Sequence, residues 1–254
     1  MKKNRNYLNL IYELSWLDFK LKYYGSVLGI FWSLLKPFMM LGILYVVFFH
    51  FLKVGIPDYQ VYLLLGIIIW NFFADATTDS TQNMAAKANL LQKTNLPPFI
   101  VVVSSVIQSF WTFVITLGIF LALFLILGFH FTWSVMMLLF LVIILVFLVF
   151  GVALIIAPLS MHFKDFRHIW DIFLQMLFWV TPIVYQYTNV PEKYLKWYLL
   201  NPIARIVIDA RNAVLYNHVP EVKQLLITTG IVALICFAGL AIFKKYNRAF
   251  IEEL

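Results

Sequence analysis

Long apolar runs alternate with shorter polar segments along the chain, and this alternation predicts helices that cross a membrane. A helix needs about 20 mostly apolar residues to span the hydrocarbon core. Six runs meet this condition, and they predict spans at about 29–52, 61–79, 99–127, 133–159, 169–187 and 225–243. An even number of crossings would place both ends of the chain on one side of the membrane.

The segment before the first span, YLNLIYELSWLDFKLKYY at 7–24, predicts an amphipathic helix. One helical stripe carries Leu10, Leu14, Leu17 and Leu21. Tyr and Trp side chains surround this stripe, as aromatic residues do at a membrane interface. We therefore expect an interfacial helix that lies on the membrane rather than crossing it. Two roles stay open for it: an anchoring collar, or part of a lateral entrance.

The long segment at 188–224 also has helical periodicity. VPEKYLKWYLLNP and ARIVIDARNAVLYN alternate apolar and charged residues at helical spacing. They predict two short helices on the membrane surface opposite the termini, in the place of external re-entrant or gate helices. Just before them, Pro182 removes a backbone hydrogen bond within the fifth predicted span, so a kink is expected there. The kink could line a cavity or face lipid.

Composition supports lipid as the solvent of this chain. Of its 254 residues, 63% are hydrophobic and 12% are charged, whereas a soluble domain has about half and about a quarter. Of the 19 Lys and Arg residues, 13 fall on the side of the termini and six on the other side. Positive residues resist translocation, so both termini are expected in the cytoplasm. The net charge of +7 is thus explained by orientation rather than by nucleic-acid binding.

Motifs for catalysis are missing from the sequence. It contains no GxxxxGK[ST] phosphate loop, no GxSxG elbow and no HExxH helix. Its five histidines are scattered over both predicted sides, so no metal site is expected. A membrane glycosyl- or acyltransferase would need a catalytic carboxylate near a membrane face. Asp75, Asp79 and Asp171 are the candidates for that alternative.

The two predicted cytoplasmic loops, 83–98 and 161–168, combine charges with apolar residues. A loop that faces water alone does not need Leu90, Phe163 or Phe166. Apolar side chains surrounded by charge are typical of protein contacts. The alternative is that these side chains dip into the lipid headgroups.

Several stretches together resemble one family of transporters. They are KYYGSVLGIFWSLLKPF at 22–38, GIIIWNFF at 66–73, NLLQKTNLPP at 89–98, FKDFRHIWDIFLQMLFWVTPIVY at 163–185 and LNP at 200–202. In this order the chain resembles the membrane subunit of ABC-2 type exporters of lipid-linked O-antigen, capsule or teichoic-acid polymers. The resemblance implies an all-α, six-span ABC-2 (type V-like) fold in the inner membrane. It also implies a homodimer working with two ABC ATPase subunits, which bind the ATP and Mg.

The resemblance assigns roles to the two inner loops. They would form coupling helices that dock on the ATPases, and Phe163 and Phe166 would enter a groove. The expected coupling residues are Leu90, Leu91, Lys93, Phe163, Lys164, Asp165, Phe166, Arg167 and His168. Among the implied cargoes, O-antigen is the first choice, and teichoic acid or capsule the second. An ABC-2 efflux permease for a small drug or lipid is an alternative.

Aromatic residues and lysines are the candidates for contact with such a cargo. Sugar rings stack on aromatic rings, and hydroxyls bond to Tyr oxygens. The expected pore-lining residues are Trp32, Tyr45, Phe48, Phe178, Trp179 and Tyr185. Lys20, Lys22 and Lys36 would attract the diphosphate of the family's lipid carrier. The alternatives are that the aromatics belong to lipid-facing belts, and that the lysines extend to anionic lipids.

Overall fold

Every regular element in the part of the chain that the structure describes is helical. The computed structural model describes residues 7–94, 96–163 and 165–252, with side chains up to Tyr246. The longer helices are α1 Tyr7–Tyr23, α2 Phe31–Tyr45, α3 Tyr59–Ala86, α4 Ala88–Thr94, α5 Pro98–Ile126, α6 Met136–His162, α7 Phe166–Val180, α8 Glu192–Tyr198, α9 Pro202–Leu215 and α10 Val222–Glu252. A π-helical segment, Val46–Phe51, continues α2, and short 3-10 turns occupy Trp133–Val135 and Tyr187–Asn189. The predicted all-helical class is confirmed.

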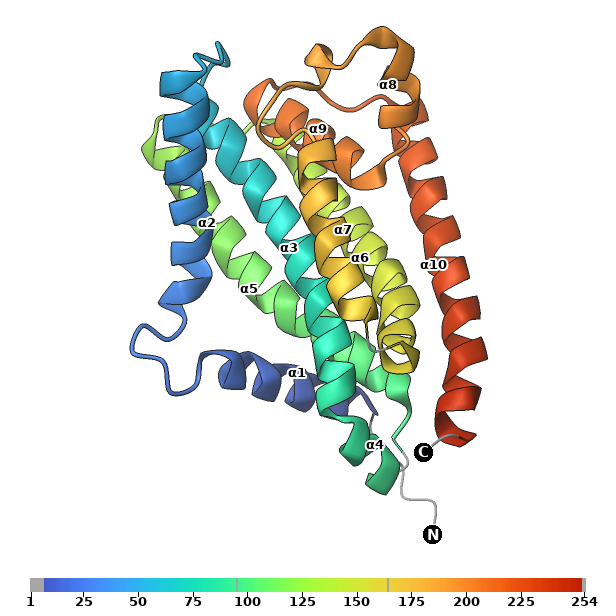
Figure 1. The fold of residues 1–254 in the computed structure, drawn as a ribbon. Helices are drawn as coiled ribbons and strands as arrows, with labels where there is room; N and C mark the ends of the chain where they lie inside the picture. The colour runs from blue at the N-terminus through green and yellow to red at the C-terminus, as the bar shows by residue number, and fades with distance from the viewer. Residues whose placement is uncertain (1–6, 95, 164, 253–254) are drawn as a thin grey trace.

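The long helices form an upright bundle with two distinct ends (Figure 1). Helices α1 and α4 and the C-terminal end of α10 lie together at what we call the lower end. Helix α8 lies at the upper end. Helix α1 runs across the lower end rather than along the bundle, as an interfacial helix would. Its Leu17 and Leu21 are exposed, whereas Ser15, Asp18 and Phe19 face the other helices.

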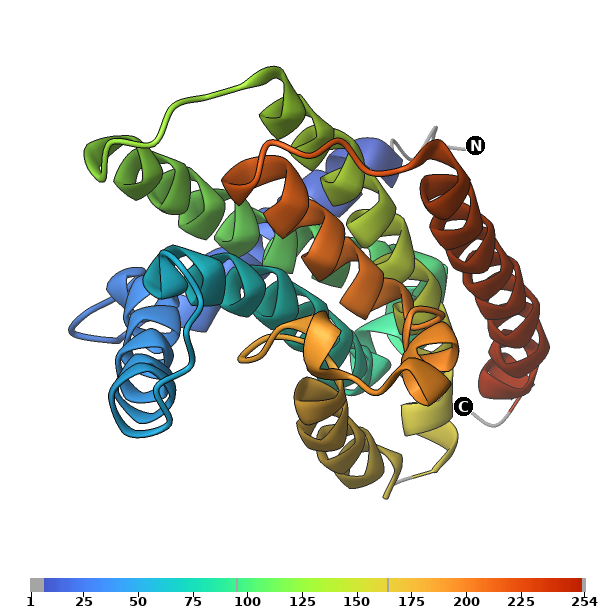
Figure 2. The ribbon, with the colours of Figure 1, turned by 90° about the horizontal axis from the view of Figure 1, so that it is seen from above.

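Helix α3 forms the centre of the bundle. It packs against α2, α5, α6, α7 and α9, which surround it in the view from above (Figure 2). Leu63, Leu65 and Ile67 are fully buried in its upper half. Of the five long apolar segments, α3 has the lowest mean hydropathy, and it carries Asp75 and Asp79. Charged side chains in a membrane-spanning helix face other helices or a water-filled cavity rather than lipid, which explains why the second apolar run occupies the core.

Five helical segments in the described residues are long and apolar enough to cross a membrane. They are Phe31–Phe51, Tyr59–Ala86, Pro98–Ile126, Trp133–His162 and Val222–Tyr246. The span expected at 169–187 is not among them, so the count of six is not confirmed. Helix α7 has 15 residues, a length of about 22 Å against the roughly 30 Å of the hydrocarbon core. After α7 the chain continues through residues 181–186, which form no helix, to the short 3-10 turn Tyr187–Asn189.

The kink expected at Pro182 is a helix end instead. Helix α7 stops at Val180, and Thr181 has extended backbone angles, with φ −88° and ψ 138°. Proline disfavours helical angles in the residue before it. The chain therefore leaves the helix at Thr181 rather than bending through it.

The two helices expected on the far surface differ in their surroundings. Helix α8 has no buried residue, as expected for a surface helix. Helix α9 is buried along most of its length and packs on α3 and α6, so it lies within the bundle, and its position at the membrane surface stays a prediction. Asn201 caps its start by accepting a hydrogen bond from the Ile203 N–H at 3.2 Å, and Pro202 occupies the first turn.

Candidate functional site

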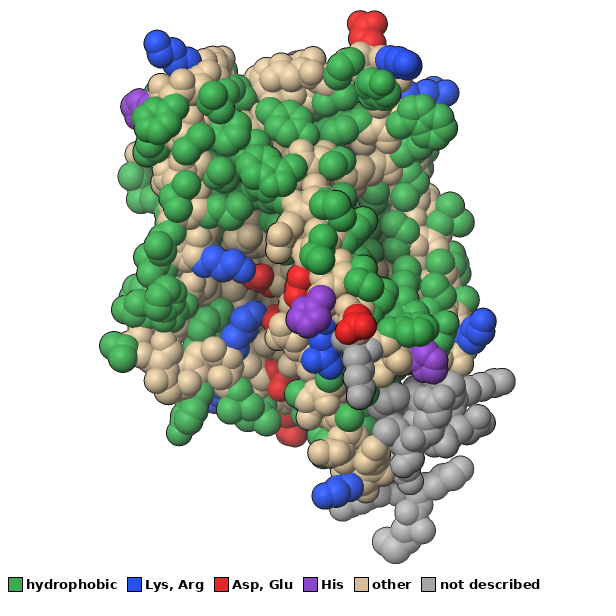
Figure 3. All heavy atoms as spheres, viewed as in Figure 1, with side chains coloured by type: hydrophobic (Ala, Val, Ile, Leu, Met, Phe, Trp, Pro, Cys, Tyr) green, Lys and Arg blue, Asp and Glu red, His purple; other side chains and the backbone are tan. Residues whose placement is uncertain are grey.

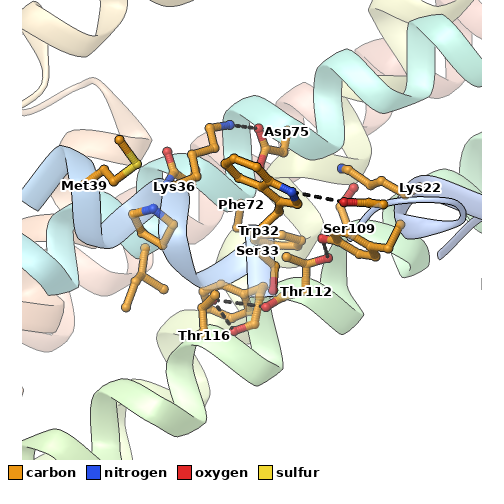
Figure 4. Close-up of a pocket in the computed structure, with 16 residues that line it drawn as sticks. Lys22, Trp32, Ser33, Lys36, Met39, Phe72, Asp75, Ser109, Thr112 and Thr116 are labelled. Carbon is orange, nitrogen blue, oxygen red and sulfur yellow. Dashed lines mark hydrogen bonds and ion pairs between the residues drawn. The ribbon is translucent and has the colours of Figure 1, made fainter. Parts of the chain in front are cut away.

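A cavity of about 560 Å³ lies in the lower half of the bundle between α1, α2, α3 and α5 (Figure 4). Its apolar side includes Met39, Phe72 and Phe113. Its polar lining consists of Lys22, Tyr23, Ser26, Trp32, Ser33, Lys36, Asn71, Asp75, Ser109, Thr112 and Thr116. Charged side chains gather in the lower half of the face in Figure 3, while the upper half is mostly hydrophobic. The cavity thus offers hydroxyl, amide and charged groups beside apolar ones.

Two lysine–aspartate ion pairs lie at this cavity. Lys22 Nζ of α1 lies 2.7 Å from Asp79 Oδ2 of α3, and Lys36 Nζ of α2 lies 2.8 Å from Asp75 Oδ1 of α3. Ser109 of α5 also donates a hydrogen bond to Asp79 Oδ2, at 2.8 Å. Asp75 and Asp79, two of the three carboxylates considered for a catalytic role, are therefore counter-ions of two lysines predicted to bind a diphosphate.

Lys22 stays strongly cationic in this setting. Burial alone would lower the pKa of Lys22, but the Asp79 and Asp75 carboxylates outweigh burial and raise the pKa above its ordinary value. Lys20, grouped with Lys22 in the sequence, lies elsewhere, with its Nζ 5.2 Å from the Trp16 ring centre. Lys22 and Lys36 therefore line the cavity, whereas Lys20 does not.

Further polar contacts hold α1 against the bundle. Lys87 at the end of α3 forms an ion pair with Asp18 of α1. The side chains of both are at most 14% exposed. The Tyr23 hydroxyl lies 3.3 Å from the Thr112 hydroxyl of α5. Because Lys87 directly precedes α4, α1 is joined both to the cavity and to the base of the first predicted coupling segment.

The predicted coupling residues fall in two places near the lower end. On α4, Leu90 and Lys93 are exposed, but Leu91 is buried in the core. At the start of α7, Asp165 and His168 are exposed, as is Phe163 before them. Phe166 and Arg167 are half-buried, and Lys164 lies outside the described residues. Burial of Leu91 leaves Leu90 as the apolar group that α4 presents, and the coupling role stays a prediction.

The predicted pore aromatics do not converge on one cavity within this chain. Trp32 lines the lower cavity and donates its indole N–H to Ser26 Oγ at 3.1 Å. Phe178 is buried, with its ring centre 5.6 Å from that of Trp70, and the neighbouring Trp179 is exposed. The remaining three, Tyr45, Phe48 and Tyr185, are partly buried against the core. Their lining role stays a prediction.

Sequence reasoning missed the polar stripe of α5. Ser105, Gln108, Ser109, Thr112 and Thr116 recur at a spacing of three or four residues. Such a stripe in an apolar helix indicates a side that faces protein or a water-filled cavity rather than lipid. Together with the spacing of Asp75 and Asp79 on α3, it was the available signal for this cavity. No cluster of three His, Cys, Asp or Glu suited to a metal occurs in the described ranges.

The bundle of long apolar helices, with α1 lying across its lower end beside a polar cavity, is typical of a multi-pass membrane protein. The chain belongs to the ABC-2 type transporter family, whose model matches residues 9–215. The family predicted from the matching stretches is thereby confirmed.

Curated relatives match over nearly the whole length. Two O-antigen export system permease proteins RfbA of Klebsiella pneumoniae are 29% and 30% identical, each covering 100% of this chain and 98% of that protein. A protein of the same name from Myxococcus xanthus is 26% identical and covers 98% of this chain. The polysialic acid transport protein KpsM of Escherichia coli is 23% identical over 89% of both chains.

Family membership fixes the general role of this chain. It is an ABC-2 transport permease and not itself an enzyme, so the transferase alternative is set aside. Permeases of this kind work with an ABC ATPase partner. With its several apolar helices, the chain is a multi-pass inner-membrane protein.

Proposed function

We propose that this chain is the permease subunit of an ATP-driven exporter of lipid-linked polysaccharide, with O-antigen as the first-choice cargo. It works as a homodimer with two ABC ATPase subunits that bind the ATP and Mg. The lower end, with α1 and the C-terminal end of α10, faces the cytoplasm, in accord with the excess of Lys and Arg predicted on that side. The proposal rests mainly on full-length similarity to proteins named as O-antigen export permeases.

The cavity supports entry of a charged headgroup from the cytoplasmic side. A diphosphate approaching Lys22 and Lys36 would replace Asp79 and Asp75 as their partner, and charge-assisted bonds to phosphate are strong. Of the two released carboxylates, Asp75 stays near water because it is about one-third exposed, and Asp79 keeps the hydrogen bond from Ser109. Ser109, with the other hydroxyl groups of the lining, offers partners for sugar hydroxyls. Exchange of partners lets the site bind an anion and release it again.

The lower end supports contact with an ATPase through Leu90 and Phe163. Both are exposed apolar side chains with charged neighbours, Lys93 on α4 and Asp165 before α7. Such groups suit an apolar anchor with charges at its rim that set orientation.

ATP hydrolysis by the reconstituted complex tests this function. The permease is co-purified with its partner ABC ATPase, and hydrolysis is measured with and without lipid-linked O-antigen glycan. We expect a stable complex and faster hydrolysis when the glycan is present. Absence of a complex, or a rate indifferent to the glycan, contradicts the proposal.

The coupling residues are tested in the same complex. Phe163→Ala with Phe166→Ala should disrupt the complex while the permease remains inserted in the membrane. The matched control is Phe131→Ala with Phe237→Ala, which removes two exposed rings from other sites and should leave the complex intact. Unchanged export in the Phe163 and Phe166 variant would show that the second loop is not a coupling contact.

The cavity volume favours a second candidate, an ABC-2 efflux permease for a small drug or lipid. About 560 Å³ lies within the roughly 300–1,000 Å³ typical of small-molecule pockets. Joint replacement Tyr45→Ala and Trp179→Ala separates the two functions. Polymer export should fail in this variant and drug resistance should be unaffected, whereas loss of drug resistance would favour efflux.

A further inference from the structure

Four consecutive backbone carbonyls after α7 each accept a hydrogen bond from a side chain of another helix. Arg211 of α9 donates its two Nη groups to Pro182 O and Ile183 O, the second at 2.7 Å. From α3, the Tyr59 hydroxyl donates to Val184 O at 2.7 Å and the Tyr62 hydroxyl to Tyr185 O at 2.8 Å. We call Arg211, Tyr59 and Tyr62 the carbonyl clamp.

The clamp is itself rigidly held. Arg211 is one of the most deeply buried side chains, at 2% exposure, and its Nε donates to Tyr62 O at 3.0 Å. Its guanidinium carbon lies 3.4 Å from the Tyr62 ring centre. Among the residues that the structure describes, Arg211 forms no ion pair with a carboxylate, so backbone carbonyls and the Tyr62 ring stabilise its charge. Gly66 makes room for it, because a Cβ there would overlap Nη2.

Irregular backbone inside a membrane protein is stable where other groups satisfy its polar atoms. The clamp meets this need for residues 182–185, and it joins the end of α7 to both α3 and α9. Removing one donor would leave a buried carbonyl unpaired. The upper end of α7 is therefore a fixed attachment.

The remainder of α7 is attached more loosely. One narrow stripe, Trp170, Leu174 and Phe178, faces the bundle, while most of the opposite face is exposed. An apolar cavity of about 340 Å³ lies beside the helix, between Trp170, Phe173 and Leu177 of α7 and residues of α3, α6, α9 and α10. This space allows the lower part of α7 to move sideways without displacing a packed core.

We propose that the carbonyl clamp is the fixed point of a lever, so that α7 pivots about its upper end when its lower end is pushed. Arg211, Tyr59 and Tyr62 are positioning residues in this device. The source of the push rests on the proposed function, because α7 begins directly beside the loop expected to dock on the ATPase. The clamp then passes the rotation of α7 into α9 and the upper end of α3.

Distances between spin labels test the fixed point in the permease alone. In a Cys236→Ala background, one labelled pair is Val180→Cys with Val222→Cys, at the upper ends of α7 and α10. A second pair is Ile169→Cys with Lys244→Cys, at their lower ends. All four sites are exposed, and dilution with unlabelled chain suppresses distances between copies. We expect a narrow distribution of distances for the upper pair and a wider distribution for the lower pair.

Removal of two hydroxyl groups should loosen this attachment. In the Tyr59→Phe and Tyr62→Phe double variant, we expect the upper distribution to become as wide as the lower one. The matched control is Tyr194→Phe, an exposed ring on α8, and it should change neither distribution. A wild-type upper distribution as wide as the lower one would overturn the proposal, as would an unchanged width in the double variant.

The complex with the ATPase tests the lever's role in transport. The double variant should hydrolyse ATP at the wild-type basal rate but export less glycan per ATP, which loss of a purely structural contact would not produce. Arg211→Lys, which retains the charge, should keep more coupling than Arg211→Gln. Parallel loss of hydrolysis and export would overturn the lever. If no ATPase complex forms, the proposed function fails, while the spin-label measurements on the permease alone still decide the clamp.

Discussion

The lower and upper ends of the bundle both place cations among helices, but they balance the charge differently. At the lower end, Lys22 and Lys36 face carboxylates, and the side chains of both pairs keep some contact with solvent, from 15% to 60% exposed. At the upper end, Arg211 is 2% exposed and faces backbone carbonyls.

This difference indicates that the lysine–aspartate pairs at the lower end can exchange partners, whereas the contacts of Arg211 at the upper end are permanent. A partly exposed ion pair contributes about 0–1 kcal/mol and can open to accept another anion. Arg211 has no such alternative, because its side chain is 2% exposed and its partners are backbone carbonyls that the fold holds in place. The lower end therefore suits binding and release, and the upper end suits mechanical attachment.

Among the substitutions that test this difference between the two ends, Gly66→Ala should lower the free energy of unfolding most. The added Cβ would overlap Arg211 Nη2 and push the guanidinium from its carbonyls, at a loss of about 3–5 kcal/mol in unfolding free energy. Unfolding in mixed micelles measures it. Gly118→Ala in α5 is the matched control, because nothing lies within 4 Å of its added Cβ. Equal effects at the two glycines would argue against a tight Arg211 site.

Gly239→Ala should cause the second-largest loss of stability. It tests a contact between two helices that involves no charged group. A Cβ at Gly239 of α10 would lie 2.5 Å from the Gly151 carbonyl oxygen of α6, so the helices must separate. We expect about 1–3 kcal/mol lower stability by the same measurement. Gly230→Ala on the same helix meets nothing within 4 Å and should be neutral or stabilising. A stable Gly239→Ala protein would mean that α6 and α10 separate at little cost.

Charge removal at the lower cavity should have smaller effects, and they should differ between the two pairs. Asp79→Asn weakens contacts with both Lys22 and Ser109, so we expect a loss of about 1 kcal/mol. Asp75→Asn removes the more exposed pair, with an expected loss of about 0.5 kcal/mol or less. Added salt should reduce both differences. A larger loss at Asp75 than at Asp79 would reverse our assignment of the stronger pair.

The smallest effect should be a change of stability at alkaline pH, where Lys22 loses its proton. The pKa of Lys22 is raised in the folded state above its ordinary value of 10.5. Its stabilisation is therefore fully present below that value and lost as the pH rises through the folded pKa. The difference in melting temperature between wild type and Lys22→Met should be constant near neutral pH and shrink above about pH 10.5. A difference in melting temperature that is already smaller just above neutral pH would mean that Lys22 loses its proton well below pH 10.5.

The fifth apolar run shows the limit of what a local sequence pattern can predict. Residues 169–187 are apolar enough to predict a span, yet the helix ends at Val180. Whether a proline bends or ends a helix depends on where the freed backbone groups find partners. Those partners, Tyr59 and Arg211, are more than 25 residues away in the sequence, so local pattern could not reveal them.

Helix α9 shows the same limit for charged residues. Periodicity predicted a helix there correctly, but its charges suggested a surface position. In the structure, Arg205 and Asp209 pair with each other within α9, with an Nε–Oδ2 distance of 3.0 Å, and Arg211 finds carbonyls of residues 182 and 183. Charges that are satisfied internally can be buried, and their partners cannot be read from spacing alone.

The sequence by itself determined the solvent, the helical class and most of the spans, because long apolar runs have one stable environment, and backbone inside lipid must satisfy its own hydrogen bonds. Matching stretches in order also determined the family. The tertiary structure alone decided the pairs Lys22–Asp79 and Lys36–Asp75 and the carbonyl clamp. These contacts join residues far apart in the chain, and their energies depend on burial and distance, which exist only once the helices have packed.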